Sequence, residues 1–111
     1  MNVLSLLALA PITWMSPYCA SKAASYSLSL SLRNELSSRG ISVIDLYPGA
    51  MDTDLMKGVN APKAEPRDVA KAILEGLQAG TEDITPDGFS ATGYVAWRKD
   101  PKELEHQLAA L

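Results

Sequence analysis

The sequence predicts an α/β domain with a mainly parallel sheet, and three observations support this. Two short apolar runs, residues 2–9 and 41–47, have the composition of strands buried on both faces. Between them, residues 18–39 contain neither proline nor glycine. That stretch is too long for a strand, which indicates a helix. Strand, helix and strand in this order predict a βαβ unit with parallel strands and a right-handed crossover.

The long helix is predicted over residues 17–39 although part of it resembles a strand. Apolar residues and serines alternate from Tyr26 to Leu32, which is the period of a half-buried strand. Length decides for the helix, with Ser16 as its expected cap and Gly40 as its terminator. On a helix three leucines form the expected apolar stripe: Leu28, Leu32 and Leu36.

The remaining elements follow in order. The second strand closes at a Pro-Gly turn, and residues 50–64 are predicted to form an irregular loop. Residues 66–79 predict an amphipathic helix, 83–85 a short third strand, and 100–111 a last helix. The helix at 66–79 has an expected apolar side: Val69, Ile73, Leu74 and Leu77. The last helix has an expected capping box: Asp100 and Glu103.

Composition excludes several classes of partner. The net charge is −3 and the basic residues are scattered, so no nucleic-acid footprint is visible. The apolar N-terminal run has no basic residue before it and is too short to cross a bilayer, which argues against a targeting or membrane segment. A single cysteine, Cys19, cannot form an internal disulfide, so we expect a cytoplasmic setting. No metal site is predicted.

Tyr18 and Lys22 are the candidate catalytic pair. Four residues apart on a helix, they have Cβ atoms about 5–6 Å from one another. A nearby ammonium lowers the pKa of a phenol from its usual value near 10, which is what a general acid or base requires. Ser5, at the end of the first strand, could donate a hydrogen bond to a substrate oxygen. The alternative is a surface pair, because helices contain many such spacings.

Three spaced motifs resemble the short-chain dehydrogenase/reductase family. "YCASK" at residues 18–22 matches its Tyr-x-x-x-Lys motif, in the form with Ser before Lys. Ser5 lies 13 residues before Tyr18, the offset of the family's serine. "YPGAMDTDL" at residues 47–55 matches its Pro-Gly-x-x-x-Thr segment. The resemblance extends through the helix at 66–79, and thus over most of the chain.

The resemblance implies a role for each matching residue. Tyr18 would exchange a proton with the substrate oxygen, and Ser5 would orient and polarise the carbonyl. Lys22 would lower the tyrosine pKa and bind the nicotinamide ribose. Two further sets would contact the NAD(P)(H) cofactor: Pro48 and Gly49 at the nicotinamide end, and Thr53 at the carboxamide. The implied chemistry is hydride transfer between NAD(P)H and a small carbonyl or alcohol substrate.

The resemblance also implies that the chain is incomplete as a domain of this family. The sequence contains no Gly-x-x-x-Gly-x-Gly and no Asn-Ala-Gly segment. Residues 1–111 would therefore be a partial domain that lacks the N-terminal dinucleotide-binding βαβ units. Its fold class would be three-layer and Rossmann-like, the C-terminal half only of a doubly wound parallel sheet. We expect a homo-oligomer or a complementing N-terminal half as partner, and we do not expect turnover from the chain alone.

Two other functions stay open at this level. Ser5 with Tyr18 and Lys22 offers a hydroxyl nucleophile and a base, which would suffice for a cofactor-independent serine-type esterase. No Gly-x-Ser-x-Gly elbow supports it, and His106 stands alone in the last predicted helix. The third possibility is a non-catalytic, truncated interaction module with an exposed helix face.

Overall fold

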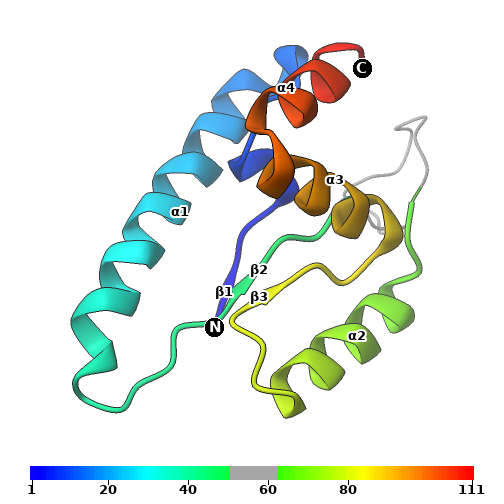
Figure 1. The fold of residues 1–111 in the computed structure, drawn as a ribbon. Coiled ribbons are helices and arrows are strands. Elements are labelled where there is room, and N and C mark those ends of the chain that lie inside the picture. Colours follow the sequence, from blue (N-terminus) through cyan, green and yellow to red (C-terminus); the bar gives the residue numbers. More distant parts are fainter. Residues whose placement is uncertain (51–62) are drawn as a thin grey trace.

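The computed structural model describes residues 1–50 and 63–111. The predicted loop over residues 50–64 falls largely outside this part. Three strands and four α-helices are present in the described residues (Figure 1). They are β1 (Asn2–Val3), α1 (Ser16–Ser37), β2 (Asp45–Leu46), α2 (Pro66–Gln78), β3 (Asp83–Ile84), α3 (Gly88–Lys99) and α4 (Pro101–Ala109). Two 3₁₀ turns precede α1, η1 (Leu6–Ala8) and η2 (Thr13–Met15).

The strands form one parallel sheet in the order β1-β2-β3, which confirms the predicted parallel α/β class. The registered rows are Asn2–Asp45–Asp83 and Val3–Leu46–Ile84. The strands are shorter than the predicted runs 2–9 and 41–47. After β1 the chain turns at once into η1, because the Ser5 hydroxyl accepts the Leu7 N–H at 3.1 Å and starts a helical turn.

Helices cover both faces of the sheet. The Asn2–Asp45–Asp83 row faces α1, where Ser29 and Arg33 bind its side chains. On the opposite face, Ile84 packs against the Cα of Gly76 in α2. Helix α1 connects β1 to β2 and helix α2 connects β2 to β3, and both connections move in the same direction across the sheet. Because the two helices lie on opposite faces, the two crossovers have opposite handedness. Only one of them can be right-handed, which is the usual handedness of such connections.

Helix α1 confirms the long-helix prediction but presents another face to the core. Gly40 ends it with a φ of +71°, a left-handed conformation that glycine adopts without strain. Ser16 is not the cap: it is the first helical residue, and its hydroxyl donates to the Thr13 carbonyl. The expected leucine stripe is only partly buried, since Leu28 is 62% exposed whereas Leu32 and Leu36 are half-buried. The fully buried residues of α1 are Cys19 and Ser29, and Tyr26 and Arg33 are half-buried beside them.

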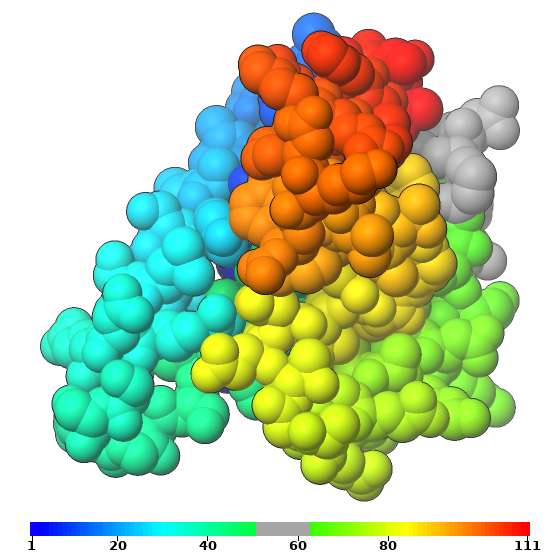
Figure 2. Space-filling model, viewed as in Figure 1, coloured from blue at the N-terminus to red at the C-terminus, as the bar shows by residue number. Residues whose placement is uncertain are grey.

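The helices near the C-terminus build a small apolar core with η1. Leu6, Ala10, Leu104 and Leu108 form its buried centre, and α3 and α4 lie over η1 in the space-filling view (Figure 2). Helix α3 was not predicted from the sequence. Asp87 and Ser90 cap it reciprocally, as a capping box.

The predicted bounds of α2 and α4 are close to the observed ones, but the buried side of α2 and the capping of α4 differ from the prediction. Leu74 of α2 is 60% exposed rather than part of the apolar side, whereas Val69 is buried. Asp100 caps α4 by accepting the Lys102 N–H. The predicted reciprocal bond from Glu103 is absent among the described hydrogen bonds, where its carboxylate accepts from Gln107 instead. Within residues 1–50 and 63–111, no helix has the length and apolar character needed to cross a membrane.

The contact between η1 and α3 gives a stability prediction. A Cβ on Gly93 would lie 2.6 Å from a Leu6 methyl and 3.3 Å from Leu104, inside the packed core. We expect Gly93→Ala to lower the free energy of unfolding by about 1–2 kcal/mol, since overpacking outweighs the gain in helix propensity. Gly88→Ala is the matched control, because a Cβ there meets nothing within 4 Å. Urea melts that show equal effects of the two substitutions would contradict this packing.

Candidate active site

Tyr18 and Lys22 lie side by side on the first turns of α1, as their spacing predicts. The Lys22 Nζ is 5.7 Å from the centre of the Tyr18 ring, within range of a cation–π contact. Tyr18 is 42% exposed, so its phenol can be reached from solvent. The pair therefore has both the proximity and the access that proton exchange with a bound substrate requires.

Lys22 also ties the helix to the sheet. Its Nζ donates to the backbone carbonyl of Val3 at 3.1 Å. Val3 is the last residue of β1, so the ammonium lies at the carboxyl end of that strand. This is the end of a parallel sheet at which α/β proteins bind their ligands.

Ser5 lies two residues beyond Val3 at the same end of the sheet. It is buried, and its Oγ accepts the Leu7 N–H. An accepting hydroxyl keeps its own proton to donate, so Ser5 can still offer a hydrogen bond to a substrate oxygen. Among the described hydrogen bonds none joins Ser5 to Tyr18 or to a group that could act as its base, which weakens the esterase hypothesis.

The Pro48–Gly49 turn follows β2 at the same edge of the sheet. The carbonyl of Pro48 accepts the Leu6 N–H at 3.3 Å, which joins the turn to η1. The Gly49 N–H donates to the Asp87 carboxylate at 2.8 Å. The carboxyl end of the sheet thus brings together three features from separate elements: Ser5, Lys22 and this turn. Thr53, the remaining predicted cofactor residue, lies outside the described residues.

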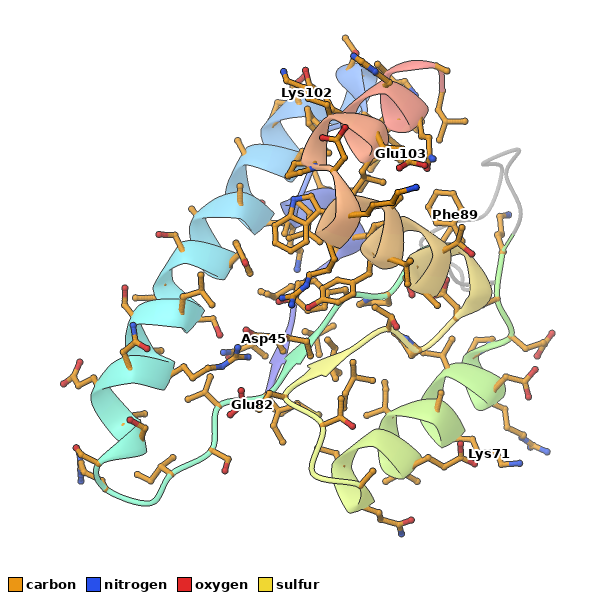
Figure 3. All side chains as sticks on the ribbon, viewed as in Figure 1. Asp45, Lys71, Glu82, Phe89, Lys102 and Glu103 are labelled. Carbon is orange, nitrogen blue, oxygen red and sulfur yellow. The ribbon has the colours of Figure 1, made fainter. Side chains whose placement is uncertain are left out.

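A cluster of charged and phenolic groups, centred on Arg33, occupies the opposite end of the sheet. The guanidinium binds Asp45 and Asp83 at 3.1 Å each, and Glu82 at 3.8 Å. Asp45 and Glu82 lie where β2 and β3 begin (Figure 3). Burial alone would lower the Arg33 pKa, but the hydrogen bond and charge of Asp83, then Asp45 and Glu82, leave it raised. No sequence pattern predicts this cluster, because its members are distant in the chain.

Two tyrosines complete the cluster around Asp83. Tyr47 donates to one carboxylate oxygen at 3.1 Å and Tyr94 to the other at 3.3 Å. Burial, followed by the negative charge of Asp83, raises the pKa of both phenols. Burial and Asp83 likewise raise the pKa of Tyr26. These three phenols stay protonated at neutral pH and support the sheet.

The described residues contain no group of three or more histidine, cysteine or acidic side chains that could hold a metal ion. Among these residues, the candidate reactive groups are the hydroxyl, phenol and ammonium groups of Ser5, Tyr18 and Lys22.

Comparison with known proteins identifies the family. The sequence model of the short chain dehydrogenases matches residues 1–64, more than half of the chain. This range contains Ser5, the Tyr18–Lys22 pair and the Pro48–Gly49 turn. The chain belongs to the short chain dehydrogenase family, and its three-strand parallel sheet matches a solved structure of that family.

Three relatives show the extent of the similarity. A short chain dehydrogenase from Burkholderia cenocepacia J2315, crystallised in complex with NADP, superposes with a TM-score of 0.87 at 30% identity, over 96% of this chain and 45% of that one. The uncharacterized oxidoreductase DltE of Bacillus subtilis is 33% identical over 76% of this chain and 36% of its own. The probable oxidoreductase EphD of Mycobacterium tuberculosis is 43% identical over 55% of this chain and 11% of its own. The chain thus spans less than half the length of these relatives.

The raised tyrosine pKa values predict how stability depends on pH. An unfolded tyrosine ionises near pH 10, whereas folded Tyr47, Tyr94 and Tyr26 hold their protons to higher pH. Their contribution is fully present below about pH 10 and is lost as the pH rises toward the folded pKa values. We expect the free energy of unfolding, measured in urea, to fall between pH 9 and pH 11.

Tyr47→Phe should make that decline shallower. At pH 7 it should also cost about 1.5–3 kcal/mol, because the bond to the Asp83 carboxylate is lost. Tyr18→Phe is the control, since the Tyr18 phenol is accessible and donates no described hydrogen bond to a carboxylate. A stability that stays constant up to pH 11 would contradict the environment assigned to the three phenols.

Proposed function

We propose that this chain carries the catalytic groups and the nicotinamide-side groups of an NAD(P)-dependent oxidoreductase that interconverts carbonyl and alcohol substrates. The observation that carries the proposal is the Tyr18–Lys22 pair at the carboxyl end of β1, the end of the sheet at which Ser5 also lies, inside the range matched to the family. The NADP complex of the Burkholderia relative supports the choice of cofactor class.

The residues fit the nicotinamide end of such a cofactor better than its phosphates. The ammonium of Lys22 and the Pro48–Gly49 turn lie at the same end of the sheet, at the carboxyl ends of β1 and β2. The glycine-rich phosphate-binding turn is absent from the sequence. The group that holds the pyrophosphate in this proposal therefore comes from outside the 111 residues.

The chemistry divides among three side chains. A bound NAD(P)H supplies the hydride that reduces a carbonyl carbon. The Tyr18 phenol gives its proton to the carbonyl oxygen, and Ser5 holds that oxygen by donating its hydroxyl proton in a hydrogen bond. Lys22 favours the resulting phenolate by its positive charge and binds the ribose hydroxyls. One of its three N–H donors contacts the Val3 carbonyl in this structure, which leaves two for the ribose.

The outer edge of β1 supports the proposal of a partner. It is one of the two edges of the described sheet, Val3 is 55% exposed, and a shallow groove of about 200 Å³ runs between β1 and α1. The groove is lined by Asn2, Val3, Leu4, Ser25, Leu28, Ser29 and Leu32. We propose that this edge pairs with the N-terminal half of a short chain dehydrogenase domain, of which this chain would be the C-terminal half. More than half of the Burkholderia chain has no counterpart in this chain. A homo-oligomer formed through the same edge is the other outcome of the test below.

Cofactor titration tests the proposal. Wild-type protein is titrated with NADPH, NADH and reduced nicotinamide mononucleotide, by cofactor fluorescence and by NMR shifts of Tyr18 and Lys22, with its solution mass determined in parallel. We expect at least the mononucleotide to bind saturably, and Lys22→Ala to weaken its binding by about tenfold through loss of the ribose hydrogen bonds. No binding of any of the three ligands at millimolar concentration would contradict the proposal and favour a non-catalytic interaction module.

Turnover separates the role of Tyr18 from binding. In whatever assembly reduces a carbonyl substrate, Tyr18→Phe should lower kcat by about 10²–10⁴-fold while cofactor affinity stays within about twofold, because only proton transfer is lost. Tyr26→Phe is the matched control, since it removes a phenol two turns further along α1 that faces Tyr47 and Trp97. Equal losses in the two variants would contradict the assignment of the proton donor.

A further inference from the structure

We propose that Asp87 is a positioning residue that fixes the Pro48–Gly49 turn in its cofactor-binding conformation. The effect of Asp87 on cofactor binding rests on the proposed function, whereas its contact with the turn rests on two hydrogen bonds of the structure. Asp87 lies between β3 and α3, 38 residues after the turn that it contacts, and no motif points to it.

A single carboxylate joins two elements. Its Oδ2 accepts the Gly49 N–H at 2.8 Å, and its Oδ1 accepts the Ser90 N–H at 2.8 Å. The first bond holds the turn that follows β2, and the second caps α3. The turn is thereby fixed to the start of a helix whose Ser90 is fully buried.

Close packing reinforces the hydrogen bond. A Cβ built on Gly49 would lie 3.0 Å from the Asp87 Oδ1 and 3.0 Å from the Phe89 ring, tighter than ordinary van der Waals contact. Phe89 lies on the first turn of α3 (Figure 3). Glycine at this position thus lets the backbone reach the carboxylate, and any side chain there would push the turn away from α3.

Helix capping alone does not require this carboxylate. Serine or asparagine caps a helix about as well as aspartate. In this structure, however, the two N–H groups bind different oxygens of the carboxylate, and an asparagine amide keeps only one of those oxygens. The bond also occupies the Gly49 N–H, which is therefore not a free donor for a ligand.

Amide hydrogen exchange tests the positioning bond without any cofactor. The exchange rate of the Gly49 N–H is compared with that of the Tyr47 N–H, which donates to Ile84 within the sheet. This ratio cancels changes in global stability. We expect Asp87→Ala to raise the ratio by about tenfold or more, as expected for a lost charge-assisted bond, with Asp87→Asn intermediate because it keeps one acceptor.

Asp100→Ala is the matched control. Asp100 caps α4 by accepting the Lys102 N–H at 3.0 Å, and it is remote from the turn in sequence and in its hydrogen bonds. It should cost similar stability while the Gly49-to-Tyr47 ratio stays unchanged. An equal ratio in Asp87→Ala and Asp100→Ala would overturn the inference whatever the function of the chain.

Binding of reduced nicotinamide mononucleotide then tests the consequence. We expect Asp87→Ala to weaken the affinity by about tenfold and Asp100→Ala by less than about twofold. Unchanged affinity in Asp87→Ala, with a raised exchange ratio, would overturn the cofactor role and leave Asp87 as a structural bridge. If wild-type protein binds no mononucleotide, the proposed function fails and the cofactor role of Asp87 is overturned with it, while the exchange ratio separately decides whether the bond exists.

Discussion

The bond between Arg33 and the buried carboxylate of Asp45 is the interaction on which the rest of the structure depends. Asp45 is fully buried at the start of the central strand, and Ser29 and Asn2 bind its other oxygen. A charge removed from water in this way is tolerated only with a hydrogen-bonded partner of opposite sign. The pair therefore fixes where α1 lies along the sheet.

The Arg33–Asp45 pair also sets the position of the candidate catalytic pair, Tyr18 and Lys22, at the other end of the same helix. Lys22, Tyr26, Ser29 and Arg33 follow one another at spacings of four, three and four, which places them on one face. With Arg33 held at the amino ends of β2 and β3, the N-terminal turns of α1 reach the carboxyl ends of the strands, where Lys22 meets Val3. The sheet thus separates a structural polar cluster at one end from accessible reactive groups at the other.

The structural features that the sequence could predict are those that depend on neighbouring residues in the chain. Length and the Gly40 terminator predicted α1, and the Tyr18–Lys22 spacing predicted their contact, because an α-helix fixes such distances by itself. The leucine stripe is only partly buried because Ser29 and Arg33 take part of the inward face of α1, where they bind the distant acids Asp45 and Asp83. Helix α3 was missed because its buried residues are Ser90, Gly93 and Ala96, too small to give an apolar period. Asp87 could not be found either, since its partner Gly49 belongs to another element.

A double-mutant cycle on Arg33 and Asp45 tests this central claim most directly. The free energy of unfolding is measured in urea for wild type, Arg33→Met, Asp45→Asn and the double variant. Removal of Arg33 alone should cost about 3–5 kcal/mol, since it leaves a buried carboxylate without its cation. The double variant should then be more stable than the sum of the single losses predicts, by about 1–3 kcal/mol. Losses that add to within about 0.5 kcal/mol would show that the two side chains do not depend on each other, and would contradict the account.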